Sequence, residues 1–183
     1  MADNTFLDEF KEYKNIPSDN TDTDTILNKI LDGAEGYLKS QYQLYLEKES
    51  ISKIYNGKNL DFIVLPSKYI SLSNVNIDSV DIDLNNFYLN DNLLFYINNF
   101  YPSGIQNIKV DFDIGFETTD DIPKDLKLAF FILADKYYEN IQQNMNNFDY
   151  VADSDFGRQK MLNTLPKNFY LLLQPHISIS LGV

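Results

Sequence analysis

The sequence predicts an α+β protein that is mainly helical, with a short N-terminal helix and two long helices that flank a small antiparallel β-sheet of hairpins. Two segments, Thr25–Glu47 and the stretch after Pro123, place apolar residues at every third or fourth position, as amphipathic helices do. Between them, from Ser50 to Phe116, apolar and polar residues alternate, which is typical of half-buried strands. The last segment, Arg158–Val183, differs from both and is expected to form an extended C-terminal tail.

The N-terminal part predicts a short helix followed by a long one. Residues Thr5–Asn15 form an amphipathic segment that ends before Pro17, because proline disfavours helical backbone in the residue before it. The first long helix, Thr25–Glu47, is expected to begin beside Asp22 or Asp24, whose carboxylates accept hydrogen bonds from exposed N–H groups. Its apolar stripe consists of Leu27, Leu31, Ala34, Leu38, Tyr42 and Tyr45.

The closely spaced carboxylates of Asp19–Thr25 also suggest a calcium site. A calcium-binding EF-hand loop needs glycine at its sixth position and glutamate at its twelfth, and here the twelfth residue is Ile30. We therefore interpret this segment as a solvated loop that leads into the first long helix.

Alternating segments predict the strands of the sheet. Asn56-Gly57 lies between two such segments and predicts a two-residue hairpin turn, because both residues tolerate positive φ. Tyr69–Ile77 alternates again, and Asp78–Asn86 is expected to be a loop or an edge segment. A second hairpin is expected around Asn90-Asp91-Asn92. Ile108–Phe116 is the clearest strand, with apolar residues on one face and charged residues on the other.

The second long helix begins at Pro123, a residue that suits a first helical turn. Its main apolar stripe consists of Leu126, Phe130, Leu133, Tyr137 and Ile141. Leu128, Phe131 and Ile132 add apolar surface on other sides, so this helix is expected to be buried on more than one face. We expect it to be central to the domain and to pack against another subunit through these three residues.

The C-terminal region is expected to begin with a polar loop, Asn144–Gly157. It then contains an apolar run, Tyr170–Leu173, and a short alternating strand, His176–Leu181. A terminal strand can dock on its own domain or add to the sheet edge of a partner, and its residues alone leave both open.

Composition excludes several classes of site. The chain has 183 residues, no cysteine and one histidine, His176, which rules out a disulfide framework, a thiol nucleophile and a site with several histidines. No glycine-rich phosphate loop occurs. The net charge of −12 disfavours binding to nucleic acid phosphates. No signal peptide or membrane-spanning run is apparent, so we expect a protein made in a cytoplasm and not bound to a membrane.

The order of motifs resembles the head–tail connector, or head completion, family of long-tailed phages. The members of that family carry a strand that ends in Gly-Tyr or Gly-Phe, then a Pro-x-Asp-Leu-Lys-x-Ala helix start, then an aromatic pair followed by Glu. The matching residues here are Val110–Phe116, Pro123–Ala129 and Tyr137-Tyr138-Glu139. Earlier matches are Asp22-Thr23-Asp24, Ala34-Glu35, Tyr37-Leu38, Asn56-Gly57 and Leu65-Pro66, so the resemblance covers about Thr5–Asn140.

The resemblance implies a structural virion protein of the phage neck that is not an enzyme and needs no cofactor or metal. It implies a ring, a dodecamer, of adaptor subunits that is stacked on the portal protein, binds a stopper or tail terminator and continues the DNA channel without specific DNA binding. Residues 1–147 would form the adaptor domain, and residues 148–183 a portal-docking extension. The candidate portal contacts are Tyr170, Leu171, Leu172, Leu173, Ile177, Ile179 and Leu181.

Two other classes compete with this interpretation. A soluble acidic binding module or regulator would pair with a basic partner, and its affinity would fall steeply with salt. A hydrolase with a carboxylate pair would have a cleft containing a carboxylate of raised pKa. The sequence has no Trp that could stack on a sugar, and its acidic residues fall mainly in loops, at helix starts and on the polar face of a strand.

Overall fold

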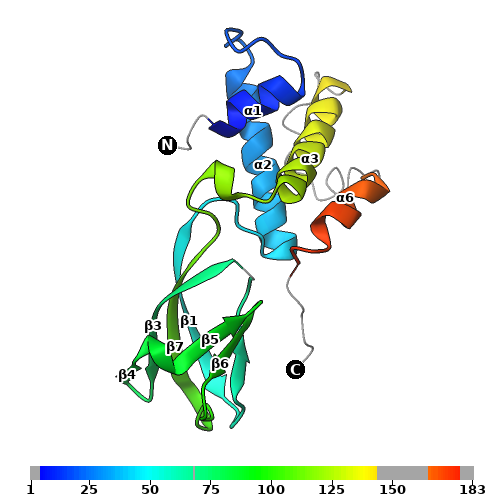
Figure 1. The fold of residues 1–183 in the computed structure, drawn as a ribbon. Coiled ribbons are helices and arrows are strands. Elements are labelled where there is room, and N and C mark those ends of the chain that lie inside the picture. The colour runs from blue at the N-terminus through cyan, green and yellow to red at the C-terminus, as the bar shows by residue number, and fades with distance from the viewer. Residues whose placement is uncertain (1–4, 68, 144–164, 178–183) are drawn as a thin grey trace. The chain divides into compact units, whose positions relative to one another are not determined.

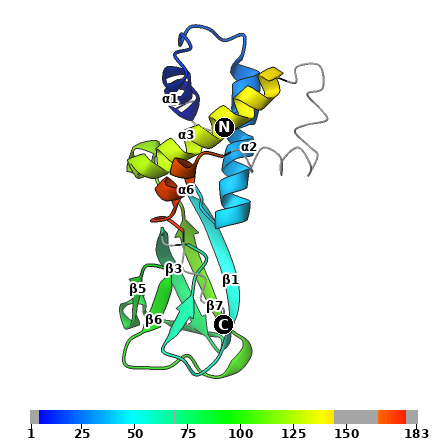
Figure 2. The same ribbon diagram turned by 90° about the vertical axis from the view of Figure 1, so that its right-hand side faces the viewer.

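A computed structural model of the chain describes residues 5–67, 69–143 and 165–177. The chain divides into two compact units, which Figures 1 and 2 show in two orientations. The first, here called the helical unit, comprises residues 1–41 and 119–175, and the second, the β unit, comprises residues 42–118 and 176–183. The β unit is therefore an insertion between two helices of the helical unit.

Four α-helices are described in the chain: α1 (Thr5–Tyr13), α2 (Asp24–Tyr42), α3 (Lys124–Gln143) and α6 (Lys167–Leu173). The α2 helix begins after Thr23, whose carbonyl oxygen accepts hydrogen bonds from the N–H groups of Ile26 and Leu27 at 3.0 and 2.9 Å. Its apolar stripe is buried, as the periodicity predicts. The α6 helix packs against α3, and both views show the two side by side (Figures 1 and 2).

The β unit contains two antiparallel sheets. The four-stranded sheet has the order β1 (Glu49–Gly57), β7 (Gly104–Ile114), β3 (Ile70–Ile77), β4 (Val80–Ile82). The three-stranded sheet has the order β2 (Phe62–Val64), β6 (Leu93–Tyr96), β5 (Phe87–Asn90). A short 3₁₀ helix, η1 (Leu84–Asn86), connects β4 to β5.

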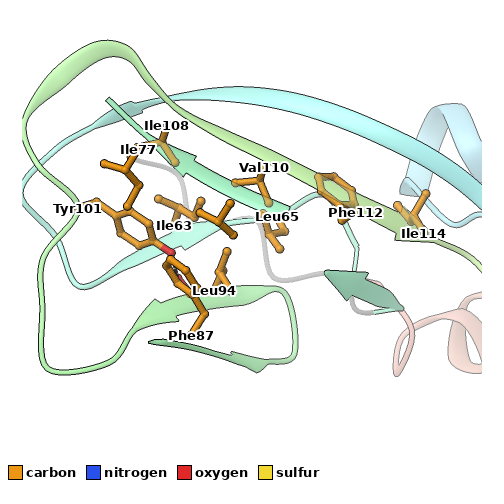
Figure 3. Packing of buried hydrophobic residues seen from close by; sticks show 11 residues of the cluster. Ile63, Leu65, Ile77, Phe87, Leu94, Tyr101, Ile108, Val110, Phe112 and Ile114 are labelled. Atoms are coloured by element: carbon orange, nitrogen blue, oxygen red, sulfur yellow. Dashed lines mark hydrogen bonds between the residues drawn. The ribbon is translucent and has the colours of Figure 1, made fainter. Parts of the chain in front are cut away.

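The core of the β unit lies between the two sheets, as Figure 3 shows. Alternation along β7 directs Ile108, Val110, Phe112 and Ile114 into this core, and each is at most 1% exposed. Their partners from the other sheet and its loops include Ile63, Leu65, Phe87, Leu94 and Tyr101. The buried strand face predicted at Ile108–Phe116 is therefore confirmed.

One of the two predicted hairpins is confirmed. Strands β5 and β6 pair with Asn90 opposite Leu93, and Asp91 in the turn has a φ of 54°. A turn that was not predicted joins β3 to β4, where Asp78 and Ser79 have φ values of 51° and 67° between the paired residues Ile77 and Val80. Positive φ at both central residues is the signature of a type I′ turn.

The hairpin predicted at Asn56-Gly57 is wrong. Strand β1 runs through both residues and pairs with β7, while β2 pairs with β6. Glycine is needed at position 57 because the chain approaches closely there: an added Cβ would lie 1.7 Å from the carbonyl oxygen of Pro102. The amide oxygen of Asn56 accepts a hydrogen bond from the N–H of Gln106 at 2.7 Å, and that of Asn107 accepts one from Gly57 at 2.9 Å.

The α+β class is consistent with the structure, but the prediction of a mainly helical domain with a small sheet is wrong. The two sheets form a core of their own, and their strands β1 and β7 are nine and eleven residues long. The first long helix ends at Tyr42, not at Glu47, and Tyr45 packs on the β core. The C-terminal region is not simply extended, because it contains α6, and its predicted strand at His176–Leu181 lies mostly outside the described residues.

Candidate assembly surfaces

Aromatic packing of α1 on α3 covers part of the surface that the sequence assigns to a neighbouring subunit. The ring of Phe131 lies 5.8 Å from that of Phe10 and 5.7 Å from that of Tyr13, measured between centroids, and Phe131 is 7% exposed. Leu128 remains 42% exposed, and Ile132, one turn further along α3, is partly buried. Of the three candidates, Leu128 is therefore the most accessible in the described chain.

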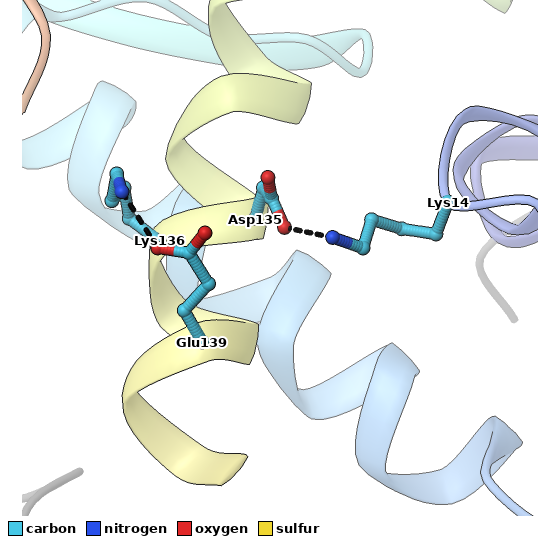
Figure 4. A network of polar contacts seen from close by, with 4 residues as sticks. All are labelled: Lys14, Asp135, Lys136 and Glu139. Carbon is cyan, nitrogen blue, oxygen red and sulfur yellow. Dashed lines mark hydrogen bonds and ion pairs between the residues drawn. The ribbon is translucent and has the colours of Figure 1, made fainter. Parts of the chain in front are cut away.

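Charged groups also connect α1 to α3 (Figure 4). The ammonium of Lys14, the residue after α1, lies 2.5 Å from the Asp135 carboxylate of α3, and within α3 the ammonium of Lys136 lies 2.6 Å from the carboxylate of Glu139. Burial acts to lower the pKa of Lys14, but its hydrogen bond to Asp135 and the charges of Asp135 and Glu139 outweigh this, so the pKa is raised. Lys14 therefore stays protonated at neutral pH and stabilises this contact.

The α6 helix has one buried face and one exposed face. Phe169 and Leu173 are fully buried in the chain's own fold, while Tyr170 and Leu171 are 46% and 67% exposed. Leu172 is partly buried. The helix thus presents apolar side chains on both faces, and burial in its own unit accounts for only one of them.

Beyond α6, the chain returns to the β unit at its single histidine, which packs within that unit. His176 is buried, and its Nδ1 shares a hydrogen bond with the hydroxyl of Tyr69. The Tyr69 ring also packs on Phe116, with centroids 4.5 Å apart. The adjacent Ile177 is partly buried, whereas Ile179 and Leu181 lie outside the described residues.

The outer face of the four-stranded sheet is polar and anionic. The Asp113 carboxylate accepts a hydrogen bond from the Ser50 hydroxyl at 2.6 Å and lies 3.2 Å from the Lys48 ammonium. These hydrogen bonds lower the pKa of Asp113, and hydrogen bonds from Asn76 and Asn74 likewise lower the pKa of Asp81. These carboxylates therefore remain ionised below the pH at which an ordinary aspartate is protonated.

The described residues contain no group of three or more histidine, aspartate or glutamate side chains placed to hold a metal ion. Among the same residues, no helix is long and apolar enough to cross a membrane.

The sequence does not predict a groove of about 350 Å³ that lies beside β1 and β2. Its lining combines residues of β1 and β2, which belong to different sheets, with Lys58, Leu60 and Tyr101 from connecting segments, so the pattern within any one segment does not show it. Lys53, on the face of β1 that also carries Ile51 and Tyr55, indicates that β1 is an edge strand, but it does not line the groove.

Three solved structures have a similar fold. The neck of an empty gene transfer agent (GTA) particle, computed with C6 symmetry, matches with a TM-score of 0.58 and 18% identity over 72% of this chain and 76% of that chain. The neck of a native GTA particle, computed with C12 symmetry, matches with a TM-score of 0.56 and 16% identity over 76% and 81%. The virion of a native gene transfer agent particle matches with a TM-score of 0.57 and 18% identity over 86% of each chain.

No curated protein sequence matches the chain significantly. A protein-family model does: the model described as head completion protein matches residues 5–176, which is nearly the whole chain. This match confirms the resemblance carried by the motifs around Val110–Phe116 and Pro123–Ala129, and with it the expectation of a structural protein of the virion neck. The chain belongs to the head completion protein family.

Proposed function

We propose that copies of this chain form a ring in the virion neck, stacked between the portal and the next neck or tail protein, and that this ring continues the DNA channel. Membership of the head completion family carries the proposal. The similar GTA necks with C6 and C12 symmetry support it, because those particles place chains of this fold in rings, and twelve copies is the number we propose here. The net charge of −12 would let DNA pass without being retained.

The ring would use α3 for contacts between subunits and the C-terminal extension, residues 148–183, for docking on the portal. Of the three candidate contacts on α3, Leu128 is exposed and Ile132 is partly buried, while Phe131 supports them from inside the unit. Tyr170 and Leu171 are the exposed apolar residues of α6, and burying them on a partner would stabilise docking by roughly 25 cal/mol per Å² of apolar area. Leu172, Leu173, Ile177, Ile179 and Leu181 complete the proposed docking region.

The experiment mixes the purified chain with its portal ring and measures the mass of the complex by native mass spectrometry or light scattering. We expect a ring of subunits on the portal. A chain that stays monomeric beside the portal under all conditions would contradict the proposal. In a second step, Leu171→Lys is expected to weaken portal binding at least tenfold, whereas Lys167→Glu, an exposed change near the start of the same helix, is expected to have little effect.

Truncation is informative only beyond α6. A cut after Phe156 would remove Phe169 and Leu173, which are buried in the helical unit, and would damage the fold as well as the docking surface. A cut after Ile177 keeps these residues and removes Ile179 and Leu181. We expect this shorter chain to fold with unchanged thermal stability and to bind portals more weakly. Unchanged portal affinity would remove these two residues from the docking region.

A further inference from the structure

The β unit has two open sides, where the edge strands of its two sheets lie. The free edge of β1 and the free edge of β2 lie on one side, here called the groove edge, because residues of both line the groove. The other side, here called the β4 edge, is formed by the free edges of β4 and β5, which η1 joins. An edge strand leaves a row of backbone N–H and C=O groups available to another chain.

The groove edge offers an apolar surface. Ile54 is 60% exposed and Leu60 is 39% exposed, and both line the groove. Tyr55 also belongs to this lining, and its hydroxyl oxygen is buried without a hydrogen-bond partner among the described residues. Burial raises the pKa of Tyr55 to about 12, so the hydroxyl keeps its proton at neutral pH.

The β4 edge is also apolar, although each of its strands is short. Val80, the first residue of β4, is 59% exposed, and Tyr88 of β5 is 50% exposed. The Tyr88 ring is held flat on Phe95, with centroids 4.7 Å apart and an interplanar angle of 8°, so its outer face is presented in a fixed orientation.

The two edges differ in charge: the groove edge has two exposed lysines beside the exposed carboxylate of Asp61, whereas the β4 edge has three exposed carboxylates. Lys53 and Lys58 are exposed at the groove edge, and neither has an ion-pair partner among the described residues. At the β4 edge, Asp78, Asp81 and Asp83 are exposed. A lysine on an edge strand opposes pairing with an arbitrary strand, but it favours an edge that brings a carboxylate.

We propose that the β4 edge of one copy docks on the groove edge of the next copy around the ring. Val80 would cover the groove beside Ile54, and Asp81 would face Lys53 or Lys58. This contact is head-to-tail, so each copy uses both edges, and a closed ring leaves neither apolar edge exposed. A second copy of this chain is the partner that would cover the exposed apolar residues of both edges. The proposal rests on the ring proposed above and names the β-unit surfaces through which its subunits meet.

Paired cysteines test this contact, because the natural chain contains no cysteine. A chain carrying Ile54→Cys and Val80→Cys is assembled on portals under reducing conditions, its ring mass is verified, and it is then oxidised. A disulfide needs Cα atoms within about 7 Å, so head-to-tail docking predicts a ladder of covalent oligomers on a denaturing gel. Each single variant is expected to give no ladder, and a mixture of the two single variants is expected to stop at dimers.

A second pair keeps the test decisive if Ile54→Cys prevents assembly. Lys58→Cys with Asp81→Cys places both thiols on exposed positions of the same two edges. The matched control joins Val80→Cys with Asp32→Cys, an exposed position of α2, and is expected to give no ladder. Rings of native mass that give no ladder with either pair would overturn the inference and leave the ring intact. Failure of the unaltered chain to form rings would instead overturn the proposed function.

Discussion

The ammonium of Lys11 lies 2.5 Å from the carboxylate of Asp24, and the lysine side chain is only 2% exposed. The pair joins α1 to the first turn of α2, where the positive end of the helix dipole also favours the carboxylate. The ammonium is further placed 3.4 Å from the carbonyl oxygen of Ser18. The aspartate that the sequence predicts as a helix cap thus binds a buried cation of the preceding helix.

Removing this cation is expected to be costly. Lys11→Ala leaves the Asp24 carboxylate, 26% exposed, without its partner, so we expect the free energy of unfolding to fall by about 3 kcal/mol. Urea unfolding followed by circular dichroism measures the loss. The control is Lys127→Ala, which breaks the more exposed pair with Glu9 and should lower the free energy of unfolding by about 0.5 kcal/mol. Equal losses for the two variants would contradict a special role for Lys11.

Gly57→Ala is expected to destabilise the β unit by about 2 kcal/mol or more, because the new Cβ would collide with the Pro102 carbonyl. Gly36→Ala is the matched control, since a Cβ there meets nothing within 4 Å and α2 gains helix propensity worth about 1 kcal/mol. Thermal unfolding of both variants should therefore shift in opposite directions. A neutral Gly57→Ala would show that the loop at Pro102 moves aside freely.

Tyr55→Phe is expected to leave stability at pH 7 unchanged or slightly higher, because it removes a buried hydroxyl that has no partner among the described residues. Burial raises the pKa of Tyr55 to about 12 in the folded chain, against an ordinary value of 10.0. Between these two pH values the unfolded chain loses the proton that the folded chain retains, so stability falls as pH rises. The variant should show a shallower fall, measured by urea unfolding from pH 9 to 12.

Tyr101→Phe provides the contrast to this variant. The Tyr101 hydroxyl donates a hydrogen bond to the carbonyl oxygen of Leu94 at 3.2 Å, so its removal leaves that buried acceptor with one partner fewer. We expect a loss of about 1 kcal/mol at pH 7. If Tyr55→Phe and Tyr101→Phe cost the same at pH 7, the Tyr55 hydroxyl has a hydrogen-bond partner in solution.

Tyr69→Phe is expected to change the surroundings of His176 and to lower stability by about 1 kcal/mol, because it removes the hydroxyl that shares a hydrogen bond with Nδ1. His176 is the single histidine of the chain, so its ring protons give one resolvable signal in proton NMR. That signal should move in Tyr69→Phe and stay in place in Tyr88→Phe, an exposed tyrosine of the same unit. An unmoved signal would contradict the contact.

The sequence predicted correctly those elements whose structure depends on neighbouring residues. The alternation of Ile108–Phe116 identified the central strand, and Asn90–Asn92 identified a hairpin, because side-chain direction and turn conformation depend on neighbouring residues. Asn56-Gly57 misled because the same residues serve a different purpose, a close approach to Pro102 in a strand whose partner, β7, lies about fifty residues later. Pairing between strands so far apart in the sequence cannot be recognised from either segment alone.

The size of the β unit was underestimated for a related reason. Strand β4 has three residues, which is too short to show a period of two, and it lies in the segment Asp78–Asn86 that the sequence predicts as a loop or an edge segment. For the candidate contacts, the pattern identified apolar residues on α3 and α6, but it did not show which of them are buried within the chain's own fold. Phe131 and Leu173 are buried by their own unit, whereas Leu128 and Leu171 are exposed, and that difference depends on tertiary packing.

The first and last segments of the inserted β unit contact each other. Glu47 and Phe116 form a bridge between backbone segments, and the ammonium of Lys48 lies 2.7 Å from the Glu117 carboxylate. An inserted unit whose first and last residues are held together can change in length without moving its two points of connection to the chain on either side. Natural variation in length within this family is therefore expected to occur at loop tips between Lys48 and Phe116. The number of residues from α2 to Glu47 and from Glu117 to α3 is expected to stay constant.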